Sequence, residues 1–123
     1  MHHNRDIDRW VMLLNRTAGG DRDLVQREIA VSFNRDPVDP AGWSPPRRLV
    51  AGGIWYPQAI APGGSDREGG GAMRFFVSGF SLWEIRFRPG PVPDGSPAAT
   101  PTITEDEIAA AFGPRRPDGG FGV

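Results

Sequence analysis

The sequence contains no cysteine and no lysine among its 123 residues. Without cysteine, disulfide bonds and thiolate metal ligands are excluded, and the redox compartment is left open. All fourteen basic residues are therefore arginine, which a GC-rich coding bias explains more simply than a need for bidentate ion pairs. No apolar run is long enough for a membrane span or a signal-peptide core, so any export signal is expected upstream of Met1 and the localisation is not fixed.

The sequence also lacks an excess of either charge. Its net charge is −1, and acidic and basic residues are interspersed, so no electrostatic footprint for nucleic acid or for an anionic membrane is present. The glycine-rich segment from Gly63 to Gly71 has neither the Walker spacing nor a lysine, which excludes a phosphate-binding loop. We predict a flexible surface connection there, and we predict neither a cofactor nor a metal ion.

What the chain does contain is enough apolar material for one modest core. Hydrophobic residues make up 38% of the sequence and include four Trp and seven Phe, which suits a single globular domain. Seventeen Gly and thirteen Pro are dense beyond Pro89. Such a composition favours long loops. We therefore divide the chain into a β-rich part at 1–88 and a Pro/Gly-rich tail at 89–123.

Strict alternation of apolar and charged residues is the strongest local pattern. Trp83, Ile85 and Phe87 fall on one side of a strand, and the charged residues between them fall on the other. This pattern is typical of an antiparallel strand with one buried face. Comparable runs predict six strands, which are Asp8 to Asn15, Gln26 to Asn34, Arg47 to Val50, Ile54 to Ile60, Met73 to Gly79 and Leu82 to Arg88.

Beyond Pro89 the alternation stops, and one helix is predicted. Thr104 is followed three residues later by Glu107, which is the spacing of a capping box at a helix start. Gly113 and Pro114 would end the helix after Phe112. The fold class predicted from these patterns is all-β, with a tail that carries one short helix near 105–112.

Three segments, in this order along the chain, suggest a relationship to a known class of proteins. They are Asn4 to Arg16, which includes Ile7-Asp8-Arg9-Trp10; Ile29 to Pro46, which includes Gly42-Trp43-Ser44; and Gly53 to Gln58, which includes Trp55-Tyr56-Pro57-Gln58. Together they resemble the C-terminal part of five-bladed β-propeller glycoside hydrolases and hydrolase-like proteins of the arabinanase and xylosidase type. The resemblance covers roughly residues 2–88 and implies blades of four antiparallel strands.

The resemblance implies about two blades. His2 to Arg5 would be the inner strand of the first blade, and Ile54 to Ile60 would be the inner strand of the second. The second blade has three predicted strands, so we expect its fourth strand to come from a segment upstream of this chain. Two blades cannot close a propeller, which needs at least about four. We expect a partial propeller, either as a fragment or as an open pair of sheets that self-associates through its strand edges.

Catalysis is not expected from this chain alone. Glycoside hydrolysis uses two carboxylates, and the resemblance places them on inner strands of earlier blades that are absent here. Neither inner-strand segment contains a carboxylate. Glu84 lies on an outer strand with Arg86 two residues away on the same face, so we predict a cross-strand salt-bridge partner rather than a catalytic acid. We predict no catalytic residue.

Two groups of residues are candidates for sugar binding. His2, His3 and Asn4 offer imidazole and amide groups that could hydrogen-bond hydroxyls, with a frayed terminus as the alternative. Trp55, Tyr56 and Gln58 combine aromatic surface with polar tips, with ordinary packing beside Pro57 as the alternative. The other three Trp residues are predicted to fill the core between blades, namely Trp10, Trp43 and Trp83.

These observations predict a carbohydrate-related fragment of a hydrolase-like propeller without activity in isolation. The alternative is a stand-alone module that binds carbohydrate or protein and forms homo-oligomers through exposed strand edges. Poor folding as a fragment is a third reading, which broad thermal unfolding would favour.

Overall fold

Two β-sheets form the described part of the chain, which in this computed structural model comprises residues 1–17, 26–51, 56–90 and 96–112. The strands are β1 His2–Asn4, β2 Arg9–Thr17, β3 Gln26–Asn34, β4 Arg47–Ala51, β5 Gln58–Ile60, β6 Glu68–Gly69, β7 Ala72–Val77, β8 Phe80–Arg88 and β9 Ala98–Pro101. A 3-10 turn at Pro40–Gly42 and the helix α1, Glu105–Phe112, complete the elements. The predicted all-β class is therefore confirmed.

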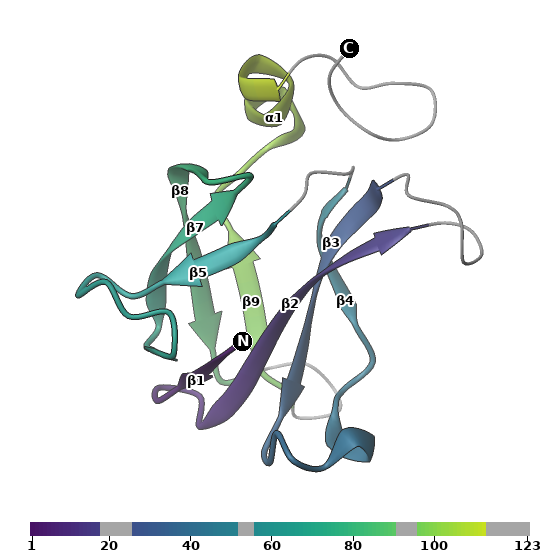
Figure 1. Cartoon of the computed structure of the whole chain (residues 1–123), viewed down its shortest axis with the longest axis vertical. Helices are drawn as coiled ribbons and strands as arrows, with labels where there is room; N and C mark the ends of the chain where they lie inside the picture. Colours follow the sequence, from purple (N-terminus) through teal and green to yellow (C-terminus); the bar gives the residue numbers. More distant parts are fainter. Residues whose placement is uncertain (18–25, 52–55, 91–95, 113–123) are drawn as a thin grey trace.

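Each sheet contains a run of antiparallel neighbours. Sheet 1 has the order β4-β3-β2-β1-β6, and sheet 2 has the order β5-β7-β8-β9. The pairs β1–β2, β2–β3 and β3–β4 are antiparallel, as are β5–β7, β7–β8 and β8–β9. Figure 1 shows the two sheets facing each other, with α1 beyond one end of sheet 2.

One hydrophobic core joins the two sheets. Sheet 1 contributes Val11 and the alternating residues Ile29, Val31 and Phe33, all at most 4% exposed. Sheet 2 contributes the corresponding inward residues of β7 and β8, which are Met73, Phe75, Val77, Trp83, Ile85 and Phe87. The period-two alternation of the sequence thus selects the buried face, because successive side chains of a strand point to opposite sides.

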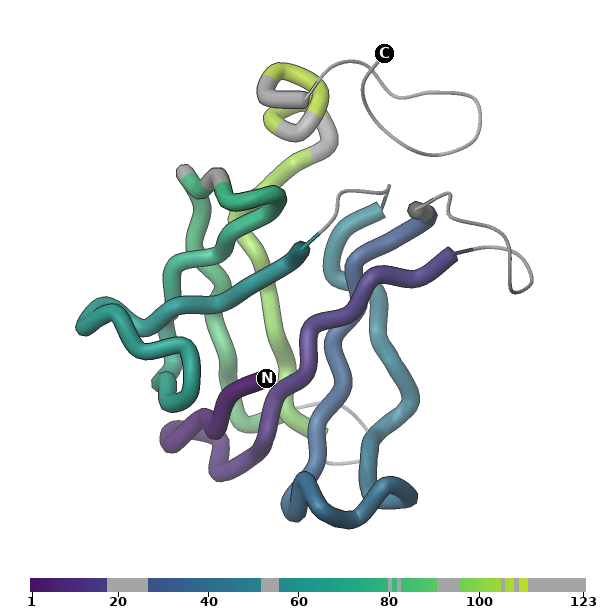
Figure 2. The backbone as a smooth tube through the Cα atoms, in the orientation of Figure 1, coloured from purple at the N-terminus to yellow at the C-terminus, as the bar shows by residue number. Residues whose placement is uncertain are grey.

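The loop between β5 and β7 crosses from sheet 2 to sheet 1. Its residues Glu68 and Gly69 form β6 and pair in parallel with His3 and Asn4 of β1. The His3 amide donates to the Arg67 carbonyl at 2.8 Å, and the Arg5 amide donates to the Gly69 carbonyl at 3.0 Å. Figure 2 shows this teal loop beside the purple amino-terminal segment. The segment 63–71 is largely exposed, as expected of a surface connection, but the prediction missed the short strand β6 within it.

The expectation that the second group of strands lacks a fourth member was also wrong. Ala98–Pro101 forms β9, which pairs with β8 from Ile85↔Pro101 to Arg88↔Ala98. Sheet 2 therefore contains four strands from this chain, and the strand comes from the segment that we had described as tail. An upstream strand is not needed to complete this sheet.

Other predictions are confirmed with small shifts. The described strands match the predicted ones to within two residues, except that β5 begins at Gln58 and Ile54 lies outside the described residues. The Glu107 amide donates to the Thr104 hydroxyl at 3.2 Å, and the Thr104 amide donates to the Glu107 carboxylate at 2.8 Å, which is the capping box. The prediction that three Trp residues fill the core is confirmed for Trp83 and wrong for Trp10 and Trp43, which are half-buried outside it.

Candidate functional site

His2 lies in β1 and is only 3% exposed. Its ring packs edge-on against Phe87 with 5.4 Å between ring centroids, and no described residue hydrogen-bonds its buried Nε2 atom. Burial, with smaller contributions from the positive charges of the amino terminus and His3, lowers the pKa of His2 from 6.5 to about 4. The imidazole is therefore neutral at pH 7.

His3 belongs to a different surface from His2, because neighbouring residues in a strand point to opposite faces. Its ring lies 5.4 Å from the Trp10 ring at an angle of 55°. Its Nε2 atom lies 3.4 Å from the Asp8 carboxylate, which is 89% exposed. The two histidines therefore cannot act together on one ligand.

Asn4 is completely buried, and the fold uses both ends of its amide. Its Nδ2 atom donates to the Gly70 carbonyl at 2.7 Å, and its Oδ1 atom accepts from the Asp6 amide at 3.2 Å. These bonds hold the β1–β2 turn against the loop that contains β6. Asn4 thus stabilises the local backbone, and it does not present its amide to a sugar.

The second predicted group is dispersed. Trp55 lies outside the described residues. Tyr56 is 76% exposed and has a positive φ of 59°. Gln58 is exposed at the start of β5, and it lines with His2 a hollow of about 240 Å³ between the two sheets. Asp66 and Arg67 of the connecting loop line the same hollow. Of the five predicted residues that the structure describes, His2 and Gln58 line this hollow together, and His3, Asn4 and Tyr56 do not line it.

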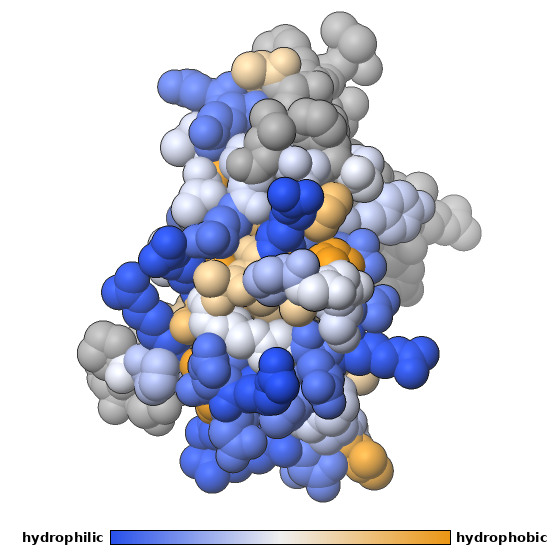
Figure 3. Space-filling view, turned by 90° about the vertical axis from the view of Figure 1, so that its left-hand side faces the viewer, coloured by the Kyte–Doolittle hydropathy of each residue, from blue (hydrophilic) through white to orange (hydrophobic). Residues whose placement is uncertain are grey.

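A larger hollow lies elsewhere, on the face of sheet 2 that points away from the core. Its volume is about 820 Å³. Figure 3 shows this side of the molecule, with apolar surface in the middle and hydrophilic residues around it. The residues that line the hollow are Ile60, Ala61, Pro62, Gly64, Ala72, Met73, Arg74, Phe76, Ser81, Trp83, Glu84 and Thr102.

Two of the lining side chains are charged, Arg74 of β7 and Glu84 of β8, which are directly opposite each other in the strand register. The Glu84 carboxylate accepts from Nε of Arg86 at 2.6 Å. Glu84 is thus in an ion pair, but its partner lies on the same strand, so the prediction of a cross-strand pair was wrong. Because both side chains are partly exposed, the pair contributes little stability, about 0 to 1 kcal/mol.

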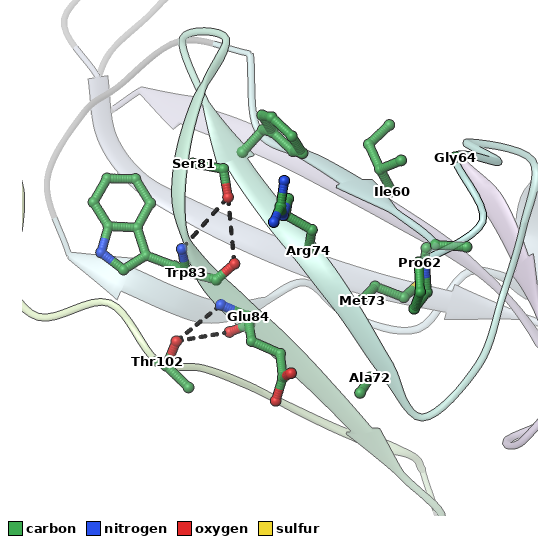
Figure 4. Close-up of a pocket in the computed structure, with 12 residues that line it drawn as sticks. Ile60, Pro62, Gly64, Ala72, Met73, Arg74, Ser81, Trp83, Glu84 and Thr102 are labelled. Carbon is green, nitrogen blue, oxygen red and sulfur yellow. Dashed lines mark hydrogen bonds between the residues drawn. The ribbon is translucent and has the colours of Figure 1, made fainter.

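Hydrogen bonds fix the backbone beneath the hollow. The Ser81 hydroxyl donates to the Phe75 carbonyl at 2.5 Å. The Thr102 hydroxyl accepts from the Glu84 amide at 2.9 Å (Figure 4). The Thr102 amide also donates to the Glu84 carbonyl at 2.9 Å. These bonds connect β8 to both neighbouring segments and so stabilise the backbone that forms the floor.

The sequence contains a signal for this hollow that did not enter the predicted site. The positions that alternate with the core residues of β7 are Ala72, Arg74 and Phe76, and the corresponding position of β8 is Glu84. A small residue, a cation, an aromatic ring and an anion on one open face indicate a mixed binding surface. That set is visible only after β7 and β8 are paired in register.

Neither a metal-binding cluster nor a membrane-spanning helix is found among the described residues. No group of three or more His, Cys, Asp or Glu side chains lies close enough to hold a metal ion there. No helix within those residues is long and apolar enough to cross a membrane.

In comparisons with known proteins, no protein-family model, no curated protein sequence and no solved structure matches the chain. Any statement about its function therefore depends on its own residues and their arrangement.

Proposed function

We propose that this chain is a carbohydrate-binding β module without hydrolytic activity of its own, related to two blades of a glycoside-hydrolase-type propeller. The observation that carries the proposal is the hollow on sheet 2, which combines apolar surface with hydrogen-bonding groups. Sugar rings have apolar faces and polar edges, and sites for them commonly offer both kinds of contact. Phe76 and Ile60 supply the apolar part, and Arg74 and Glu84 supply the polar part.

The proposal that the chain does not hydrolyse sugars rests on the number of carboxylates in the hollow. Hydrolysis of a glycosidic bond needs two carboxyl groups about 5 to 10 Å apart that face the same bond. Among the described lining residues, Glu84 is the single carboxylate, and Arg86 already neutralises it. A hollow with one ion-paired carboxylate suits binding better than hydrolysis.

The chain order of the strands supports the relationship to propeller blades. β1 to β4 are consecutive antiparallel neighbours, and so are β5, β7, β8 and β9 once the short β6 is set aside. Each run is thus a four-stranded meander, which is the arrangement of a propeller blade. The parallel pairing of β6 with β1 is an addition to that pattern.

Isothermal titration with arabino-, xylo- and galacto-oligosaccharides tests the proposal. We expect binding of at least one saccharide, weakened about three- to tenfold by Phe76→Ala because a ring-stacking surface is removed. Tyr56→Ala is the matched control, because it removes an exposed aromatic ring outside the hollow. A loss caused by Tyr56→Ala instead would move the site to the start of β5, and an absence of all binding would refute the proposal.

A reducing-sugar assay on the same saccharides tests the absence of catalysis. We expect no release by the purified chain. Release that Glu84→Gln abolishes would show that this carboxylate is catalytic, contrary to the proposal.

Self-association through strand edges is a second candidate, and the sheet order favours it. Sheet 2 ends at β5 and β9, and sheet 1 ends at β4 and β6, so these four strands are the sheet edges within the described residues. All four edge strands are short, from two to five residues. Light scattering over a hundredfold concentration range should show a rising mass; a constant monomer mass would exclude this candidate.

A further inference from the structure

The outward face of sheet 2 carries an excess of positive charge. β7 and β8 present three guanidinium groups and one carboxylate on it, from Arg74, Arg86, Arg88 and Glu84. The register places them on one face, because Arg74 is opposite Glu84 and Ala72 is opposite Arg86. The chain as a whole is slightly acidic, so this face departs from the average.

Arg74 is the cation of this set that lines the hollow. Although it is opposite Glu84 in the register, the Glu84 carboxylate is bound by Arg86 at 2.6 Å. No hydrogen bond or ion pair joins the Arg74 side chain to another residue in the described ranges. Arg74 therefore keeps all five of its N–H donors for a ligand.

The surroundings of Arg74 define what such a ligand would look like. In Figure 4 the Arg74 side chain lies between Ile60 of β5 and Glu84 of β8. Phe76 is two residues further along β7 and thus on the same face, half-buried beside Gln58 of the neighbouring strand. The Arg74 guanidinium group and the Phe76 ring thus lie two residues apart on the same strand and line the same hollow.

We infer that the hollow takes an acidic saccharide, with the carboxylate of a uronic acid residue on Arg74 and the sugar ring against Phe76. This inference rests on the proposed carbohydrate binding and names the class of sugar. A guanidinium group matches the geometry of a carboxylate through two parallel, charge-assisted hydrogen bonds, and a neutral sugar has no anionic group to make them. Arg86 prevents Glu84 from repelling the ligand, because it neutralises that carboxylate.

A matched pair of probes tests the charge. Trigalacturonate and its fully methyl-esterified form share their rings and linkages and differ in the carboxylates. We expect the acid to bind about two- to fivefold more tightly than the ester in isothermal titration, because a charge pair at an exposed arginine contributes up to about fivefold in affinity. A sulfated galacto-oligosaccharide of the same length serves as a third probe.

Substitutions of single arginines test which of them binds the carboxylate of the sugar. Arg74→Ala should remove the preference for the acid and change the affinity for the ester by less than twofold. Arg74→Lys should keep part of the preference, because lysine retains the positive charge but lacks the paired N–H donors of the guanidinium group. Arg88→Ala is the control, since Arg88 lies on the same strand face but does not line the hollow. Arg74 and Arg88 are both exposed, so the variants should fold, which circular dichroism checks.

Each other outcome has a defined meaning. Equal binding of acid and ester, weakened by Phe76→Ala, would overturn the acidic class and leave carbohydrate binding standing. An equal loss in Arg88→Ala and Arg74→Ala would show general charge attraction and overturn the placement at Arg74. Tighter binding of the sulfated probe than of the acid would overturn the assignment to a carboxylate. Binding of no saccharide at all would overturn both this inference and the proposed function.

Discussion

The polar side chains of β1 differ in what they can offer a ligand because they differ in burial. Asn4 is fully buried, and both ends of its amide form hydrogen bonds, to Gly70 and Asp6. His3, in contrast, is partly exposed beside Trp10. Residue type alone predicts hydrogen-bonding capacity for all three positions. It cannot predict which groups the fold itself consumes, since the partner of Asn4 is 66 residues away in sequence.

His2 should make the stability of the protein depend on pH. Its pKa in the folded chain is about 4, below the ordinary value of 6.5, so the unfolded chain binds a proton between these values that the folded chain does not. The free energy of unfolding should therefore fall as the pH falls from 6.5 to 4, and His2 should have no effect above pH 6.5. By pH 4.5 the loss from this group should be roughly 2 kcal/mol.

Urea unfolding followed by tryptophan fluorescence at pH 7.5 and 4.5 measures this loss. His2→Phe is the comparison, because it keeps an aromatic ring against Phe87 and cannot titrate. The variant should lose roughly 2 kcal/mol less than the natural sequence over that interval. An identical loss in both proteins would mean that His2 titrates normally.

At the scale of elements, side-chain pattern predicts strands well where one face is buried and poorly where only the backbone pairs. β3 and β8 follow strict alternation and were predicted to within two residues. β9 contains Pro101 and three small or polar residues, and it pairs only with β8, where an edge strand tolerates proline. β6 is two residues long and includes Gly69, so it is too short to show an alternation of apolar and polar side chains.

The β7–β8 hairpin depends on a tight turn of two residues with positive φ, Ser78 at 49° and Gly79 at 75°. Positive φ at both positions matches the twist of the flanking strands. Gly79→Ala should lower the free energy of unfolding by about 1 kcal/mol, because a side chain strains this backbone conformation. A Cβ atom there would meet nothing within 4 Å, so backbone strain is the whole cost.

Gly63→Ala is the control for this turn. A Cβ atom at Gly63 also meets nothing within 4 Å, and its φ is not in the left-handed range. Alanine there should leave stability unchanged or raise it by up to about 1 kcal/mol, since it restricts the unfolded chain. Equal effects of the two substitutions in thermal unfolding would argue against strain at Gly79.

At the scale of the whole molecule, two meanders share one core, and β6 ties the loop of one sheet to the first strand of the other. Neither sheet could bury its inner face without the other, because a single sheet exposes one apolar side to water. The chain should therefore unfold as one unit. The third reading of the sequence, a poorly folded fragment, predicts broad unfolding instead.

A pair of conservative core substitutions tests whether the sheets unfold together. Ile29 of β3 and Ile85 of β8 are 1% and 0% exposed, and they occupy the same core from opposite sheets. Ile29→Val and Ile85→Val should each lower the free energy of unfolding by about 1 kcal/mol, because each removes one buried methyl group. In a single cooperative transition, both variants move the entire denaturation curve, whether it is followed by fluorescence or by circular dichroism. If the sheets unfolded separately, each variant would shift only one of two phases, and the shared core would not be what holds the molecule together.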